Sequence, residues 1–165
     1  MLEKMKNAGY TALGIGVFLL IFLIPVAFIM GSVWIGEYVL PWLFTIAWIV
    51  LAINILILLP LGLFRKTGAI GGIGMYVSSY AFGLTLWFLG LLLTYFVWGF
   101  LGVFIGLALL GIGVVPVAML AMLLNGEWGT LLVLIILTVL TFGSRMLGMY
   151  FAERAEANAV PVAYE

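Results

Sequence analysis

Few residues in this sequence are of a type that does chemistry. The chain contains no cysteine and no histidine, and its printed sequence also lacks Asp and Gln. Metal sites built on thiolates or imidazoles, Cys nucleophiles and a Ser-His-Asp triad are therefore excluded. Acid–base chemistry would fall to Glu37 and Glu127, each a single carboxylate between a glycine and an aromatic residue. We expect no catalytic residues, no cofactor and no metal, and treat the two glutamates as candidate loop acids.

A polar stripe follows one face of the helix expected over 129–150. It consists of Thr130, Thr138, Thr141 and Arg145, at separations of eight, three and four residues. Polar groups inside a membrane usually face other helices or a water-filled cavity. Thr hydroxyls can also bond back to their own helix, and an Arg near a helix end can extend to the surface. Asn54 lies deep in an earlier apolar segment, where an amide seeks an interhelical hydrogen bond. The candidate polar seam therefore comprises Asn54, Thr138, Thr141 and Arg145.

Polar residues are sparse because the composition suits lipid rather than water. The 165 residues are 67% hydrophobic and 7% charged, whereas soluble domains have about a quarter charged residues. Apolar runs of about 18 residues or more are typical of transmembrane helices. Six basic and six acidic residues give zero formal net charge, which leaves no electrostatic footprint for nucleic acid. The expected partners are the lipid bilayer and other membrane helices, from a second copy or from other subunits.

We predict an all-α integral membrane protein with a compact bundle of about five transmembrane helices. A single domain over 1–152 is followed by a short polar tail over 153–165. The helices are expected over about 10–33, 39–63, 70–97, 100–124 and 129–150. Gly31 to Tyr38 would break the first two apart, and Pro41 suits the first turn of the second.

The segment from Ala69 to Asn125 decides the topology. Its 57 residues would form a helix about 85 Å long at 1.5 Å per residue, whereas one crossing takes about 20 residues. Two crossings fit if the chain turns at Trp98-Gly99-Phe100, where clustered aromatic residues favour a membrane interface. The alternative has four helices, with part of this segment folded as a re-entrant element.

Basic residues predict the orientation. The first two expected helices are flanked by Lys4, Lys6, Arg65 and Lys66. The positive-inside rule places both pairs, and the N-terminus, on the cytoplasmic side of a plasma (inner) membrane. Five crossings then put Glu127 inside, and Glu37 and Arg145 outside. Four crossings would instead bring all six basic residues inside.

Glycines predict the helix contacts. One face of the helix over 100–124 carries Gly99, Gly102, Gly106 and Gly113. Gly102 and Gly106 form a GxxxG pattern, which allows close backbone approach in lipid. The first helix has a similar small face at Gly9, Ala12 and Gly16. Both faces could serve packing within the monomer or between copies. The glycines of GAIGGIGMY (68–76) are interpreted differently, as a flexible or irregular entry to the helix over 70–97.

Three function classes remain. The favoured one is a non-catalytic helix-packing subunit or scaffold of a membrane complex, because the sequence has small-residue faces, few buried charges and little mass outside the membrane. The alternative is a small oligomeric channel or transporter, although such pathways usually need more intramembrane polar groups than this chain supplies. The third class is a lipid-modifying membrane enzyme, which would depend on Glu37 and Glu127.

Overall fold

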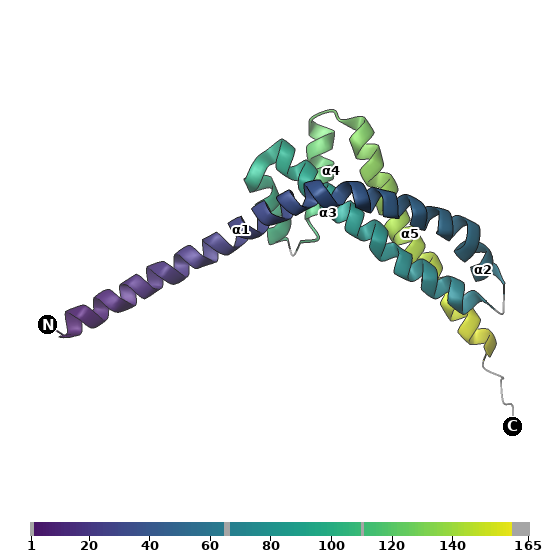
Figure 1. Cartoon of the computed structure of the whole chain (residues 1–165), viewed down its shortest axis with the longest axis horizontal. Helices are drawn as coiled ribbons and strands as arrows, with labels where there is room; N and C mark the ends of the chain where they lie inside the picture. Colours follow the sequence, from purple (N-terminus) through teal and green to yellow (C-terminus); the bar gives the residue numbers. More distant parts are fainter. Residues whose placement is uncertain (1, 65–66, 110, 160–165) are drawn as a thin grey trace, which may run out of the picture.

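The protein is entirely helical apart from short turns over the residues described by the computed structural model, which are 2–64, 67–109 and 111–159 (Figure 1). The elements are α1 (Leu2–Ile53), the π-helical turn η1 (Asn54–Leu58), α2 (Leu59–Leu63), α3 (Gly68–Ala108), α4 (Val114–Leu124) and α5 (Trp128–Ala159). The predicted all-α class is confirmed. Within the described ranges, three helices are long and apolar enough to cross a membrane: Val26–Leu63, Gly68–Ala108 and Trp128–Ala157.

The first helix is continuous where a break was predicted. α1 passes through residues 31–38, and Pro41 lies inside it rather than at the start of a second helix. Glycine and proline cost about 1 and 3 kcal/mol in a helix interior, but contact with α3 supports α1 on both sides of these residues. Gly36 lies against Leu92, since a Cβ on Gly36 would be 3.3 Å from its side chain. Farther along, Thr85 Oγ1 donates to Leu43 O at 3.4 Å.

α1 continues into α2 through a single widened turn. Pro60 has no backbone N–H, and in a regular α-helix its ring would clash with the carbonyl four residues earlier. In the structure the N–H of Leu59 bonds to the carbonyl of Asn54, five residues before it, which is the π-helical pattern. Pro60 therefore widens this helix instead of ending it.

α3 changes direction at Gly99, inside the predicted turn. Gly99 is the non-helical residue within α3, with φ 66° and ψ −156°, a combination open to glycine but strained for L side chains. Residues 100–108 then run back beside the first part of α3. The indole Nε1 of Trp87 donates to Gly111 O at 3.1 Å, so Gly111 lies about three helical turns back from Gly99.

Residues 100–124 form a hairpin of two short pieces instead of the single helix that was predicted. We call this segment the hairpin. Residues 100–108 and α4 extend about 14 and 17 Å at 1.5 Å per residue, so neither reaches across a core of about 30 Å. Gly111, with φ 73°, lies between them. Pro116 stands in the first turn of α4, where its missing N–H has no helical partner to lose. The hairpin lies in the segment that the alternative topology assigned to a re-entrant element. That alternative has four long helices, whereas three helices in the described ranges are long and apolar enough to cross a membrane, two before the hairpin and one after it.

α3 is the central helix of the bundle, and α1 and α5 both run antiparallel to it. Gly36 of α1 meets Leu92, while Gly62 of α2 meets Gly71. One buried cluster joins α3, α4 and α5: Leu86, Leu89, Ala118, Ala121, Met122, Leu134 and Leu137. A second joins α1, α3 and the hairpin: Ile29, Val33, Leu91, Leu92, Val103 and Val114.

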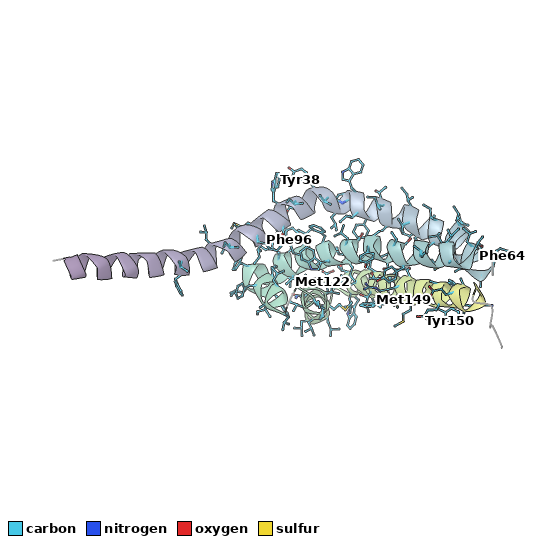
Figure 2. The ribbon with its side chains drawn as sticks, turned by 90° about the horizontal axis from the view of Figure 1, so that it is seen from below. Tyr38, Phe64, Phe96, Met122, Met149 and Tyr150 are labelled. Atoms are coloured by element: carbon cyan, nitrogen blue, oxygen red, sulfur yellow. The ribbon has the colours of Figure 1, made fainter. Side chains whose placement is uncertain are left out.

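Both ends of the chain differ from expectation. Residues 2–28 of α1, here called the N-terminal arm, extend alone beyond the bundle (Figures 1 and 2). Among the side chains that the structure describes, Ile29 is the first buried one. At the other end α5 continues past Tyr150 to Ala159, so the predicted tail is helical over 153–159. Residues 160–165 lie outside the described residues.

Candidate functional site

Backbone contact between two glycines sets α5 against the start of α3. A Cβ added to Gly148 would lie 2.6 Å from Tyr76 N, and one added to Gly72 would lie 2.6 Å from Ala152 N. Real Cβ atoms do not approach backbone this closely, so both positions require glycine. The segment 68–76 is therefore not the irregular entry that the sequence suggested. It is regular helix from Gly68 and forms a tight helix contact.

This pairing places Arg145 of α5 over two tyrosines one turn apart on α3. Arg145 Nη2 donates to Tyr76 Oη at 3.2 Å and to Tyr80 Oη at 3.4 Å. The guanidinium carbon lies 5.2 and 5.5 Å from the two ring centroids, within the range of cation–π attraction. Phenol oxygens and aromatic faces, rather than a carboxylate, thus surround the positive charge.

A groove of about 400 Å³ opens beside this cluster. It is lined by Ser79, Tyr80, Gly83, Leu84, Trp87, Thr141 and Arg145, and we call it the Arg145 groove. The hydroxyl of Ser79 donates to Tyr76 O at 2.6 Å, and that of Thr141 donates to Leu137 O at 2.7 Å. Both hydroxyl protons are therefore used within their own helices. Arg145 is the only charged residue in the lining.

The predicted polar seam is only partly assembled. Thr141 and Arg145 line the Arg145 groove, whereas Thr138 donates to Leu134 O at 2.7 Å and is not part of the lining. Asn54 lies in η1 and is 4% exposed. Neither its amide nitrogen nor its amide oxygen has a hydrogen-bond partner within the described residues. The interhelical hydrogen bond expected of Asn54 is therefore not formed there.

The sequence interpretation missed the tyrosines that hold Arg145. Tyr76 and Tyr80 are four residues apart, so they share a face of α3. The sequence alone was enough to predict that shared face. Their rings meet edge to face, with centroids 5.8 Å apart. Nothing in the spacing alone indicates that Arg145, 65 residues beyond Tyr80, faces them. That register comes from the contact of Gly72 with α5.

The predicted glycine face lies in the hairpin. It comprises Gly99, Gly102, Gly106 and Gly113. A Cβ on Gly106 would be 3.0 Å from Val114 Cα, and one on Gly113 would be 2.8 Å from Gly106 O. A Cβ on Gly102 would be 2.6 Å from Trp98 Cβ. Gly106 and Gly113 thus let the hairpin fold on itself, whereas Gly102 packs against Trp98, before the turn. Gly99 is the turn residue and has nothing within 4 Å of an added Cβ.

The two candidate loop acids are exposed and lie toward the same end of the bundle. Glu37 follows Gly36, which packs against Leu92 near that end of α3, and Glu127 precedes the antiparallel α5. The separation across a membrane that five crossings implied is therefore not found. Arg145, expected on the same side as Glu37, bonds to tyrosines. Arg65 and Lys66, expected on the same side as Glu127, lie outside the described residues.

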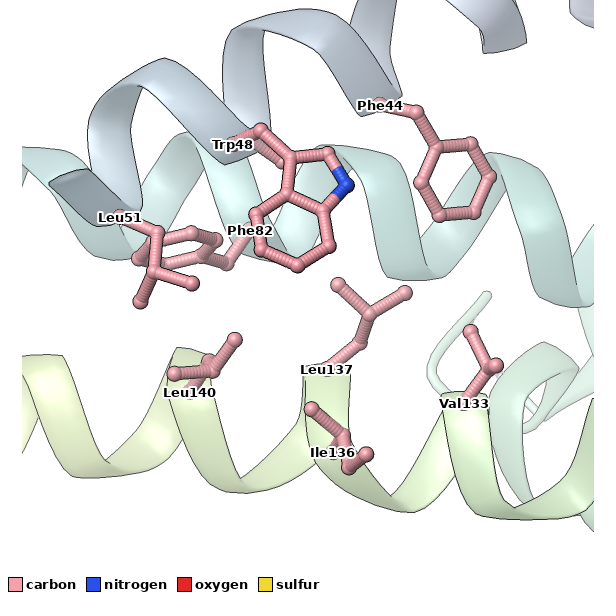
Figure 3. A pocket seen from close by; sticks show the side chains of 9 residues that line it. Phe44, Trp48, Leu51, Phe82, Val133, Ile136, Leu137 and Leu140 are labelled. Atoms are coloured by element: carbon pink, nitrogen blue, oxygen red, sulfur yellow. The ribbon is translucent and has the colours of Figure 1, made fainter.

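A second, mostly apolar groove lies between α1 and α5 (Figure 3). Its volume is about 350 Å³, and it is lined by Phe44, Ala47, Trp48, Leu51, Phe82, Val133, Ile136, Leu137 and Leu140. Figure 3 shows Trp48 and Phe44 of α1 above Leu137 of α5. Trp48 is 70% exposed. An acyl chain or the side chains of another helix would fit this surface, whose lining side chains carry one polar group, the indole nitrogen of Trp48.

Comparison with protein-family models, with curated proteins and with solved structures finds no match in any of the three. Within the described residues, no group of three or more His, Cys, Asp or Glu side chains could hold a metal ion. The Arg145 groove is therefore singled out by geometry, as a place where a cation, two phenols and an open groove meet.

Proposed function

We propose that this chain is a non-catalytic, multi-pass membrane protein that serves as a helix-packing subunit or scaffold of a membrane complex. The observation that carries the proposal is the N-terminal arm. It supplies an apolar helix surface that the rest of the described chain does not cover. The partner that we propose is another membrane helix, from a second copy or from a different subunit.

The length of α1 supports this proposal. Its 52 residues extend about 78 Å at 1.5 Å per residue, more than twice a hydrocarbon core of about 30 Å. The part from Ile29 onward already runs along α3. The arm adds about 40 Å more, which the same crossing cannot accommodate by tilting alone.

The side chains of the arm support it as well. Leu23 is 63% exposed, Ile24 65% and Phe28 52%. Exposure to water would cost about 25 cal/mol per Å² of such surface, so lipid or protein must cover it. A Cβ on Gly14 or Gly16 would meet nothing within 4 Å. Small residues on an open apolar helix let a second helix approach closely, which favours protein as at least part of the cover.

Substitution of one arm glycine tests the proposal, with a matched glycine elsewhere as control. Gly16→Leu adds bulk to the open face of the arm, and Gly143→Leu adds the same bulk to α5, where the space is equally open. Neither change disturbs the bundle itself. After extraction in mild detergent, we expect the wild type and Gly143→Leu to run as an assembly and Gly16→Leu to run as a monomer. Mass and composition of the wild-type assembly tell self-association from association with other subunits.

A wild-type monomer in mild detergent, with no other chain attached, would overturn the proposal. Equal loss of assembly in Gly16→Leu and Gly143→Leu would overturn the role of the arm. The predicted plasma-membrane location and cytoplasmic N-terminus remain part of the proposal. A reporter fused before Met1 that reads extracytoplasmic would contradict that orientation.

A small oligomeric channel or transporter is the second candidate, and the hairpin is the observation that favours it. Interrupted helices in transporters often mark substrate or ion sites. Here, however, part of the interruption packs against protein, since Trp87 donates to Gly111 O and Val114 is 0% exposed, whereas Leu109 and Ile112 are 59% and 77% exposed. Ion flux or solute uptake in liposomes reconstituted with the pure chain would favour this candidate over the subunit.

A further inference from the structure

We propose that the Arg145 groove binds an anionic membrane lipid. The phosphate of the lipid is held by Arg145 and Tyr76, and an acyl chain lies along Gly83, Leu84 and Trp87. This site lies on α3 and α5, on a different part of the molecule from the N-terminal arm. It therefore does not depend on the assembly proposed above.

Uncompensated charge is the first reason. The guanidinium of Arg145 is permanently charged, and a cation in an apolar region needs an anion or strong acceptors. Its only hydrogen bonds to the described residues run from Nη2 to Tyr76 and Tyr80. The Nε and Nη1 donors face no acceptor there. Guanidinium donors in this planar arrangement match a phosphate, which they can bind through two parallel hydrogen bonds.

The phenols complete a set of converging donors. Tyr80 Oη donates to Tyr76 Oη at 3.5 Å, and Arg145 Nη2 donates to the same Tyr76 oxygen. Tyr76 Oη thus accepts two hydrogen bonds, while no described residue accepts its own proton. That proton and the remaining guanidinium donors can all point at one oxyanion. A cation as ligand would meet only repulsion here, because Arg145 is the sole charge lining the groove.

The depth of Arg145 suits a lipid headgroup. The next charged residue along α5 is Glu153, eight positions on and about 12 Å away along the helix. Arg145 therefore lies on the apolar side of the charged C-terminal end of α5. From this position its side chain can extend toward the lipid phosphates. Tyrosines favour this interfacial level, where Tyr76 and Tyr80 stand.

The walls of the groove favour a lipid over a free phosphate ion. Its volume of about 400 Å³ is within the range of ligand sites, about 300–1,000 Å³. Beyond Arg145 the lining is Gly83, Leu84, Trp87 and Thr141, whose methyl carbon would be 3.4 Å from a Cβ on Gly83, and Leu84 is 49% exposed. An acyl chain buries this apolar surface, whereas an inorganic ion leaves it uncovered. The same ligand would contact Trp87, whose indole holds the hairpin at Gly111.

The test uses the full chain in nanodiscs that contain equal amounts of phosphatidylglycerol and phosphatidylcholine. Native mass spectrometry then counts the lipids that stay bound after the disc is removed. We expect the wild type to retain phosphatidylglycerol in preference to phosphatidylcholine. Arg145→Ala should lower that preference about tenfold, as the loss of a charge-assisted contact predicts. Arg145→Lys keeps the charge but loses the planar donors, so it should fall between the two.

Arg154→Ala is the matched control, because it removes the same charge from the same helix outside the groove, and we expect it to keep the wild-type preference. Tyr76→Phe retains the ring but lacks the donor, and should lower the preference severalfold even if Arg145→Ala does not fold. An unchanged preference in Arg145→Ala or, failing that variant, in Tyr76→Phe overturns the proposal. So does an equal loss in Arg154→Ala. If soluble glycerol phosphate raises the detergent Tm as much as phosphatidylglycerol does, a soluble anion replaces the lipid as the ligand.

Discussion

Two sets of glycines in this chain have the same chemistry and opposite surroundings. At the contact of α3 with α5, a Cβ on Gly72 or Gly148 would lie 2.6 Å from backbone atoms of the facing helix. In the N-terminal arm, a Cβ on Gly14 or Gly16 would meet nothing within 4 Å. Both sets sit on regular apolar helices. Only the first set has a partner helix within the described chain.

The difference shows what a glycine in an apolar helix indicates. Glycine weakens a helix relative to alanine by about 1 kcal/mol, and close packing can repay that cost because the backbones approach each other. At Gly72 and Gly148 the close packing of α3 on α5 offsets this cost within the chain. Gly14 and Gly16 of the arm have the same cost, and an added Cβ at either would meet nothing within 4 Å, which is why we look for the partner of this surface outside the chain.

The largest effect is expected from filling the packed glycine. Gly148→Ala places a Cβ 2.6 Å from Tyr76 N and 2.7 Å from Gly72 O, so α3 and α5 must separate. Overpacking of this kind costs about 3 kcal/mol, at the upper end of the usual range. We expect a much lower Tm in detergent. Gly14→Ala, the same change in the arm, should leave the Tm unchanged or raise it. Equal Tm values for the two variants would remove the distinction between the two sets.

Gly99 distinguishes two reasons for which a position can require glycine, a lack of space for a Cβ and a backbone conformation that strains other residues. An added Cβ at Gly99 would meet nothing within 4 Å, as in the arm, but its φ is 66°. Strained dihedrals of this kind cost about 2 kcal/mol for an L side chain. Gly99→Ala should therefore lower the Tm clearly. Gly143→Ala should not, because Gly143 has equally open surroundings but lies in the regular helix α5. A neutral Gly99→Ala would mean that the turn into the hairpin is not fixed by this backbone conformation.

Asn54 shows that packing in the bundle does not satisfy every group. It is 4% exposed, and neither polar atom of its side chain has a partner within the described residues. An unsatisfied buried amide costs about 1–2 kcal/mol, so Asn54→Leu, similar in size and apolar, should raise the Tm. A lower Tm in this variant would show that Asn54 has a partner that stabilises the fold.

The smallest effect concerns the attachment of the hairpin. Trp87→Phe removes the indole donor to Gly111 O, a hydrogen bond worth about 1 kcal/mol. Amide hydrogen exchange at Gly111 and Gly113 should become faster, while exchange at Gly72 in the α3–α5 contact should not change. If both regions exchange faster, the hairpin and the bundle open as one unit.

The sequence predicted the features that depend on local chemistry. The all-α class follows from long apolar runs with few charges, and the turn at Gly99 follows from counting residues against the thickness of a bilayer. The turn at Asn125 and Gly126 was also placed correctly, before a helix that starts at Trp128. In each case the signal is carried by neighbouring residues, so no distant contact is needed to read it.

Other predictions failed where a distant contact outweighed the local signal. Gly36 and Pro41 would weaken an isolated helix, but α1 continues through both because it packs on α3. The helix over 100–124 was expected to be whole, whereas Gly111 interrupts it and its carbonyl is held by Trp87. Local propensities amount to a few kcal/mol at most, and packing against a central helix exceeds them.

By itself the sequence determined the kind of molecule, since its composition and apolar runs specify helices suited to lipid. It also placed Arg145 on a polar stripe of the helix over 129–150, with a neighbouring helix, a water-filled cavity or the membrane surface left open as its surroundings. Only the tertiary structure decided that the hydrogen-bond partners of Arg145 are Tyr76 and Tyr80. The register of α5 on α3 is set where Gly72 and Gly148 let two backbones meet, and a contact between residues so far apart leaves no pattern in either segment alone.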